Sequence, residues 1–318
     1  MRTEDAVARI RNNAGWLRLE QLGLIRVSGP NRIKFLHSLL SNDIASLAPG
    51  QSRRAALMNL KGQQVAWMQV LVEADAVFCE LPVAVRDRVV DTFIHYKVGA
   101  PVRFEKTDST IFGVVGRAAR ETLTALGATS IPENAGTFSI STVADASVRI
   151  SCGQDLPAQG FTVHVLPSQA ASLEEALRGR MGEPLPLAVL DTLRVEEGLA
   201  WHGIDVTEEN LLHETGQLGV YHSSSKGCYL GQEVVARLEG RGGNVNKKLM
   251  GLKCDAPVAA GAEISCEEKI IGRVTSAGLS PQFGPIAMGY AHRAQSEPGT
   301  KVTVAGIAAE IVALPFRT

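Results

Sequence analysis

Residues 226–243 read KGCYLGQEVVARLEGRGG, and the pattern of strand-like and helical segments differs on the two sides of this stretch. Upstream, strand-like and helical segments mix without the regular strand–helix alternation of a doubly wound parallel sheet. Downstream, from about residue 246, five short strand-like runs are separated by Gly, Pro and charged turns, the last run spanning residues 301–314. Such a series predicts a small antiparallel barrel. We therefore expect an α+β region over residues 1–245 and a C-terminal β-barrel over residues 246–318.

The quoted stretch surrounds Cys228 with small and polar residues, which departs from the pattern of a buried core segment. Gly227 and Gly231 let the backbone turn tightly on either side. Apolar residues at helical spacing then predict a helix over about residues 232–239, so Cys228 would lie just before a helix N-terminus, where backbone dipoles favour a thiolate. Lys226 would act in the same direction. A free cysteine is usually a small buried hydrophobe, and the local residues favour neither interpretation over the other.

Basic residues gather around the same stretch. Between residues 226 and 253 the sequence holds six basic and two acidic residues, a net charge of +4. The six, which we call the basic island, are Lys226, Arg237, Arg241, Lys247, Lys248 and Lys253. A charge run is most often a solvated face, but this one would also suit an anionic tail such as phosphate or polyglutamate. Only Tyr229 could stack on a base there, so direct nucleic-acid binding is not expected.

The composition of the whole chain limits its function. The 318 residues include 32 basic and 33 acidic ones, so no overall field attracts nucleic acid or anionic lipid. Five cysteines are too few for a secreted disulfide framework, so we expect reduced thiols, with Cys79, Cys152, Cys254 and Cys266 in structural positions. No signal peptide, transit sequence or apolar stretch of membrane-spanning length stands out. We expect a cytoplasmic protein with no membrane partner.

Common metal and nucleotide signatures fail on spacing. Residues 213–217 read HETGQ, with Gln where a zinc-protease helix needs its second His. Cys254 and Cys266 stand apart, and the sequence has no Cys-x-x-Cys pair that would support a structural zinc site. A Walker loop and a dinucleotide fingerprint are likewise missing. We expect no metal site.

The motif around Cys228 is long enough to compare with known families. The run 226–233, followed by VVAR at 234–237 and RG at 241–242, resembles the signature of the YgfZ family of folate-binding proteins. This resemblance implies a tetrahydrofolate-binding accessory protein that supports the maturation or repair of iron–sulfur enzymes and, through them, tRNA modification. Iron–sulfur enzymes or their assembly factors would be transient partners. Cys228 would be the working residue, as a transient ligand, as protection for a cluster donor, or in a mixed disulfide.

Two further segments resemble the glycine-cleavage T-protein, the aminomethyltransferase of the parent superfamily. Residues 191–198 (DTLRVEEG) and 203–205 (GID) look like its central segment, and residues 24–50 are similar to its opening. The resemblance covers nearly the whole chain and is weakest between about residues 105 and 185. It implies a three-part cloverleaf of two α+β subdomains and a C-terminal barrel, arranged around a channel that takes tetrahydrofolate.

The same resemblance implies which residues hold the folate. Glu196 and Glu214 match the glutamates that hold the pteridine in T-proteins, and an ionised carboxylate can accept two parallel hydrogen bonds from an aminopyrimidine edge. The proline that usually precedes the second glutamate is missing here. Arg194, Arg237 and Arg241 are further candidates for binding the cofactor.

An early hairpin distinguishes the branches of the superfamily. Residues 65–72 and 76–81 are rich in β-formers and flank an acidic turn. T-proteins carry an acidic pair in this hairpin, one member of which is the catalytic aspartate, whereas the matching stretch here holds Ala66 and Trp67. Without that carboxylate no obvious group orients the folate amine or manages its proton, so aminomethyl transfer is not expected.

Two alternatives stay open. One is an aminomethyltransferase with a displaced catalytic carboxylate, for which Asp43, Glu73 and Asp75 are poor substitutes. The other is an interaction module that uses the basic island to dock RNA or an acidic partner. The second alternative ranks last, because the island lacks a set of stacking aromatic residues.

Overall fold

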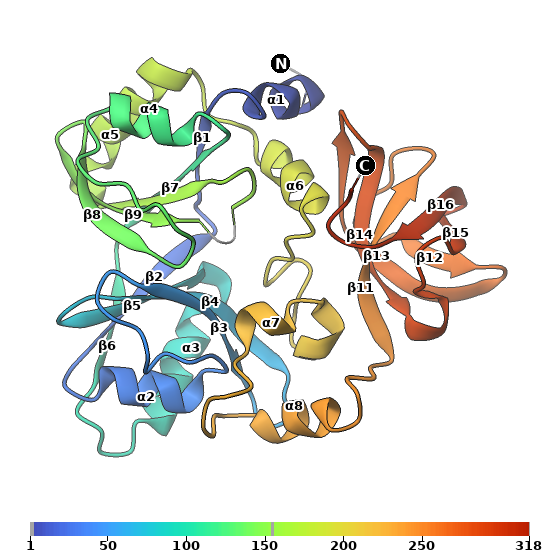
Figure 1. Cartoon of the computed structure of the whole chain (residues 1–318), viewed down its shortest axis with the longest axis horizontal. Helices are drawn as coiled ribbons and strands as arrows, with labels where there is room; N and C mark the ends of the chain where they lie inside the picture. The colour runs from blue at the N-terminus through green and yellow to red at the C-terminus, as the bar shows by residue number, and fades with distance from the viewer. Residues whose placement is uncertain (1–2, 154–155, 318) are drawn as a thin grey trace.

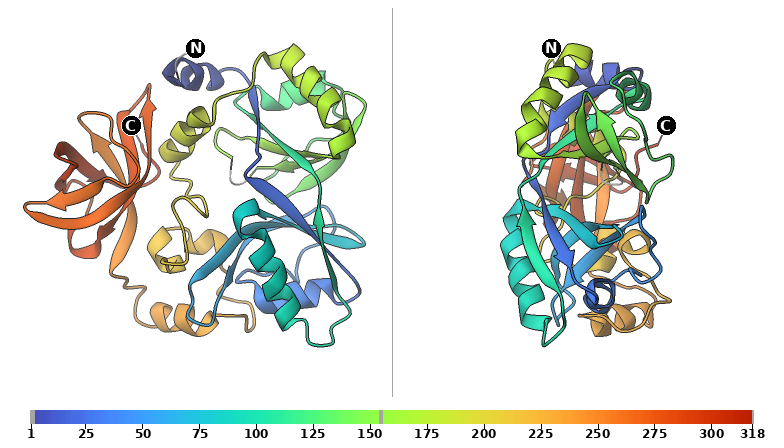
Figure 2. Two further views of the ribbon diagram at one scale, coloured as in Figure 1. Left: turned by 180° about the vertical axis from the view of Figure 1, so that it is seen from behind. Right: turned by 90° about the vertical axis from the view of Figure 1, so that its left-hand side faces the viewer.

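The computed structural model of the chain describes residues 3–153 and 156–317. Three bodies surround a common centre in Figure 1: two five-stranded sheets with their helices, and a closed β-barrel. The edge-on view in Figure 2 shows that this arrangement is flat. The predicted fold class, an α+β three-part cloverleaf with a C-terminal antiparallel barrel, is confirmed.

The first body is an antiparallel sheet with strand order β3-β4-β5-β2-β6, blue to teal in Figure 1. Its elements are β2 (Leu22–Ser28), α2 (Arg32–Leu39), β3 (Ser52–Met58), β4 (Gln64–Val72), β5 (Ala76–Pro82), α3 (Val83–Tyr96) and β6 (Arg103–Thr107). Strands β4 and β5 form the predicted hairpin. Cys79 and its alternate neighbours along β5 pack with Phe35 of α2 and Phe93 of α3. Because side chains alternate along a strand, Glu80 lies on the opposite face.

The second body is a sheet with strand order β1-β7-β10-β9-β8. Its elements are β1 (Gly15–Arg18), β7 (Thr110–Val115), α4 (Ala119–Ala125), β8 (Phe138–Val143), β9 (Ala146–Cys152), β10 (Phe161–Val165) and α5 (Pro167–Met181). Residues 19–21 alone separate β1 from β2 of the first body, and residues 108–109 separate β6 from β7. These two short crossings hold the sheets side by side.

The third body is the barrel, with strand order β11-β14-β13-β12-β15-β16, closed by pairing between β11 and β16. Its elements are β11 (Lys247–Cys254), β12 (Glu263–Cys266), β13 (Lys269–Ser280), β14 (Gly284–His292), η2 (Arg293–Gln295), β15 (Lys301–Val304) and β16 (Ile307–Val312). The run 301–314, expected as one strand, is thus two. Ala305 and Gly306 between them have φ of 48° and 84°. Positive φ at both central residues is typical of a tight hairpin turn, which an alanine does not signal in the sequence.

The remaining helices connect these bodies: α1 (Thr3–Ile10), α6 (Leu187–Glu196), η1 (Leu212–Thr215), α7 (Leu218–Tyr221) and α8 (Gln232–Glu239). Helix α6 packs against β13 of the barrel. At Gly278 of β13 a Cβ atom would lie 2.8 Å from Thr192 Oγ1, so this close approach requires glycine. Helix α6 is therefore held on the barrel, and the segment that follows it turns toward the two sheets.

Candidate functional site

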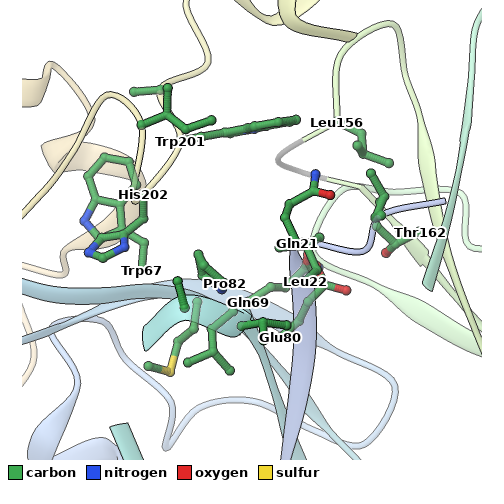
Figure 3. A pocket seen from close by; sticks show the side chains of 18 of the residues that line it. Gln21, Leu22, Trp67, Gln69, Glu80, Pro82, Leu156, Thr162, Trp201 and His202 are labelled. Atoms are coloured by element: carbon green, nitrogen blue, oxygen red, sulfur yellow. The ribbon is translucent and has the colours of Figure 1, made fainter. Parts of the chain in front are cut away.

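A cavity of about 270 Å³ lies where the two sheets meet the segment after α6. Figure 3 shows it from close by. The volume is near the lower end of small-molecule sites, which span about 300–1,000 Å³. Its wall is mostly apolar, and the polar or aromatic side chains that line it include Gln21, Trp67, Gln69, Glu80, Thr162, Trp201 and His202. We call it the central cavity.

Aromatic side chains form part of this wall. The Trp67 indole stacks on the Tyr221 ring, with centroids 3.9 Å apart and planes inclined by 26°. Its Nε1 donates to Gln64 Oε1 at 2.9 Å, which fixes the indole. In Figure 3 Trp201 lies across the cavity from the sheet of the first body. Such faces suit a flat heterocycle, because offset stacking of π-systems is favourable.

Polar groups stand on the sheet wall. Gln69 of β4 and Glu80 of β5 are cross-strand neighbours, and both line the central cavity. Gln69 Nε2 donates to Ser52 Oγ at 3.0 Å. The Glu80 carboxylate is hydrogen-bonded through Oε2 to Nε2 of His164 on β10, so this contact joins the two sheets. Sequence reasoning missed these residues, although a glutamate in the middle of an apolar strand was a usable signal.

The two hairpin positions that carry acids in T-proteins hold an alanine and a tryptophan in this chain. Ala66 is fully buried in the core of the first body, and Trp67 is the stacked indole. The three carboxylates considered as substitutes are each paired with a basic residue: Asp43 with Arg53, Glu73 with Arg149 and Asp75 with Arg26. None of the three lines the central cavity, whereas Glu80 does.

Glu196, the last residue of α6, is 8% exposed and lies in a wider recess of about 1,200 Å³ outside the central cavity. Arg11 Nη2 donates to both of its carboxylate oxygens at 2.9 Å. Ser280 Oγ of the barrel donates to the same carboxylate. Leu156 lines the central cavity, and Ala158 and Gln159 of the same loop line the recess. Burial and the charge of Glu196 raise the pKa of the neighbouring Glu197.

Glu214 lies elsewhere, in η1. Its Oε2 accepts from the backbone N–H of Leu211 at 3.1 Å, and Lys247 Nζ of β11 lies 3.8 Å away. Burial raises the pKa of Glu214, which the Leu211 N–H and Lys247 partly oppose. Glu196 and Glu214 therefore have separate surroundings, and neither lines the central cavity.

Arg194, a candidate for binding the cofactor, makes its observed contacts within the protein. The side chain is 1% exposed and forms ion pairs with Asp191 and Asp205, at 2.8 and 2.6 Å. Its Nη2 donates to Ser276 Oγ of the barrel at 2.6 Å, and the guanidinium lies over the Trp201 ring at 4.8 Å. Arg194 thus joins α6, the segment after it and the barrel from within the core.

Cys228 is exposed in the loop that precedes α8. Lys226 Nζ donates to the backbone carbonyl oxygens of His37 and Leu40, at the end of α2, and so ties this loop to the first body. Burial lowers the pKa of Lys226 to about 8, and the carboxylate of Asp43 opposes this shift.

The loop also depends on Gly231. Its φ is +80°, and a Cβ there would lie 2.5 Å from the carbonyl oxygen of Asn59. The second glycine of the motif is therefore required by the backbone in two ways, by its positive φ and by the close approach of another segment.

The rest of the basic island is spread over α8, the loop after it and β11. Arg237, Arg241, Lys248 and Lys253 are exposed, and Lys247 is half-buried beside Glu214. None of the island's residues lines the central cavity.

Two features do not occur among residues 3–153 and 156–317. No helix there is long and apolar enough to cross a membrane. No three His, Cys, Asp or Glu side chains in those ranges gather in a way that would hold a metal ion.

Comparisons with known proteins place the chain beside aminomethyltransferases. The family described as the GCVT N-terminal domain matches residues 2–222, and the glycine cleavage T-protein C-terminal barrel domain matches residues 247–317. The mitochondrial aminomethyltransferase of Gallus gallus is 30% identical over 295 residues, 88% of this chain and 74% of that protein. A putative chloroplastic transferase of Arabidopsis thaliana is 24% identical, covering 97% of this chain and 73% of that protein. The crystal structure of aminomethyltransferase T of the glycine cleavage system from Bartonella henselae matches with a TM-score of 0.89 and 25% identity, covering 98% of this chain and 89% of that one.

Proposed function

Because this chain belongs to the glycine cleavage T-protein family, we propose that it binds a reduced folate at the centre of its three bodies. The central cavity supports this proposal, since Trp67 and Trp201 offer flat faces and Gln69 and Glu80 offer polar groups on one wall. A few polar groups in a mostly apolar cavity are typical of a site that fixes the orientation of one ligand.

We propose further that the protein binds folate in a supporting role, as in the YgfZ family, and does not transfer an aminomethyl group. The observation that carries this proposal is the hairpin, where Ala66 is buried in the core and Trp67 is stacked on Tyr221. Neither side chain can hold a proton for an amine, which general acid–base catalysis requires.

In this proposal Glu196 and Glu214, which have separate surroundings, are the two candidates to accept hydrogen bonds from the aminopyrimidine edge of the folate. Glu196 lies in the recess, where its carboxylate is bound by Arg11. A ligand that reaches from the central cavity into the recess would displace Arg11 from this carboxylate. Arg237 and Arg241 are exposed and suit the carboxylates of a glutamate tail.

Cys228 would serve the iron–sulfur enzymes that this protein supports, and through them tRNA modification. Its exposure supports this role, because a thiol must be accessible to hold a transient ligand or to form a mixed disulfide. Lys226 holds the loop that presents it.

Two measurements test the proposal. Calorimetry of the full chain with tetrahydrofolate should show binding, and a chain that binds no folate would refute the proposal.

In a strain lacking the protein, the activity of several iron–sulfur enzymes should fall, and expression of the wild-type protein should restore it. Cys228→Ala should fail to restore it, whereas Cys266→Ala, a half-buried control, should succeed. Full restoration by a folded Cys228→Ala protein would exclude the thiol-based role.

A second candidate is an aminomethyltransferase with a displaced carboxylate. Relatives that carry this name favour it, and so does Glu80, a carboxylate in the central cavity. Turnover of a lipoyl-bound aminomethyl group with tetrahydrofolate would identify this activity, and an isolated defect in glycine breakdown would accompany its loss.

A further inference from the structure

Glu80 is a buried ionisable side chain of the first body. It is 5% exposed, it lies on the face of β5 turned away from α2 and α3, and it lines the central cavity. Figure 3 shows it beside Gln69 on the wall opposite Trp201. Because a buried carboxylate is costly unless it is hydrogen-bonded, its partners determine its role.

One of those partners is His164, which reaches Glu80 from the other sheet. The two side chains are hydrogen-bonded through Nε2 and Oε2, and His164 is 3% exposed. His164 Nδ1 has no hydrogen-bond partner among the residues that the structure describes. The His164 imidazole on β10 therefore orients the Glu80 carboxylate through this hydrogen bond.

The second carboxylate oxygen of Glu80 is left for another group. Within residues 3–153 and 156–317, the hydrogen bond to His164 is the one that this carboxylate forms. The neighbouring Gln69 directs its amide nitrogen to Ser52, so it does not serve Glu80. An acceptor held in place on a cavity wall requires a donor from whatever occupies the cavity.

We propose that Glu80, oriented by His164, accepts a hydrogen bond from a ring N–H of a reduced pteridine in the central cavity. This inference rests on the proposed function. A tetrahydropteridine carries hydrogens on N5 and N8, whereas the oxidised ring of folic acid has bare nitrogens there that present lone pairs. A carboxylate attracts the first arrangement and repels the second. Glu80 would thus select the reduced cofactor.

Calorimetry under anaerobic conditions with tetrahydrofolate and with folic acid tests the inference. The wild type should bind tetrahydrofolate at least about tenfold more tightly, since a hydrogen bond to a charged group is worth more than the energy of a tenfold change. Glu80→Gln should lose about this factor for tetrahydrofolate, and its affinity for folic acid should stay the same or rise, because the repulsion by the carboxylate is removed. Glu105→Gln, an exposed glutamate of the same sheet, is the matched control.

His164 is the positioning residue, and its variants separate this role from a purely structural one. His164→Leu should lower the ratio of the two affinities, and His164→Gln, which keeps a donor, should restore it. Damage to the fold would weaken the binding of both ligands equally and leave the ratio of the two affinities unchanged.

The results distinguish the two proposals. If the wild type binds neither folate, the proposed function fails and this inference fails with it. If the wild type binds tetrahydrofolate but does not prefer it, or if Glu80→Gln keeps the preference, this inference is wrong and folate binding stands. The comparison of ligands on the wild type decides the matter even if the Glu80 variant does not fold.

Discussion

Arg11 and Glu196 are joined by two hydrogen bonds of 2.9 Å from one guanidinium nitrogen to both carboxylate oxygens. Arg11 directly follows α1, and Glu196 ends α6, so the contact ties the start of the chain to the central segment. A guanidinium offers N–H donors much as an aminopyrimidine edge does. Arg11 is therefore bound to the Glu196 carboxylate, which by the family resemblance would bind the ligand.

The first prediction is that Arg11→Ala raises the affinity for tetrahydrofolate by about tenfold, because the ligand no longer displaces a charge-assisted hydrogen bond. Calorimetry measures the change. The free energy of unfolding should fall by about 1–3 kcal/mol, because the buried Glu196 carboxylate loses a charge-assisted hydrogen bond. Arg18→Ala removes an exposed arginine of β1 and is the control. Weaker binding by Arg11→Ala would mean that Arg11 itself holds the ligand.

The second prediction concerns the two glutamates. Glu196→Ala and Glu214→Ala should each weaken tetrahydrofolate binding by about 1.5–3 kcal/mol, the value of a hydrogen bond to a charged group. Glu209→Ala, an exposed neighbour in the same segment, should bind as the wild type does. If both variants keep the wild-type affinity in calorimetry, the roles carried over from the family do not apply to this chain.

The third prediction concerns Arg194. Arg194→Met leaves Asp205, which is fully buried, without its cation, and breaking such a pair costs about 3–5 kcal/mol. Urea unfolding should show this loss. Arg178→Met removes an exposed arginine paired with Glu174 on α5 and should cost less than about 1 kcal/mol. Equal losses in the two variants would contradict the structural role of Arg194.

The sequence predicts the parts of this fold that depend on local pattern. The hairpin of β4 and β5 and the strands of the barrel follow from short β-forming runs between turn residues. The turn at Ala305 was missed, because an alanine with positive φ has no signature in the sequence. Local pattern therefore sets the elements more reliably than it sets their ends.

The candidate site was harder to predict, because long-range contacts create it. Glu80 and His164 are 84 residues apart in the sequence and meet only when the two sheets pack. The resemblance identified Glu196 by position, but it could not show that Arg11, 185 residues away, would bind the same carboxylate. Arg194 was named as a candidate for binding the cofactor, and the helix pattern gave no sign that it would pair with the buried Asp205.

The last prediction is a pH dependence that comes from Lys226. Its pKa falls from 10.5 to about 8 on folding, so between these values the unfolded chain binds more protons than the folded one. Stability contributed by this group must then rise with pH from about 8 to about 10.5. Other groups titrate in the same range, and therefore the quantity to measure is the difference in free energy of unfolding between the wild type and Lys226→Met. This difference should move in favour of the wild type between pH 7 and about pH 10, whereas the exposed Lys248→Met should show no such movement. A difference that stays constant, or that moves the other way, would mean that the Lys226 ammonium is not held in a partly desolvated position against the carbonyl groups of His37 and Leu40.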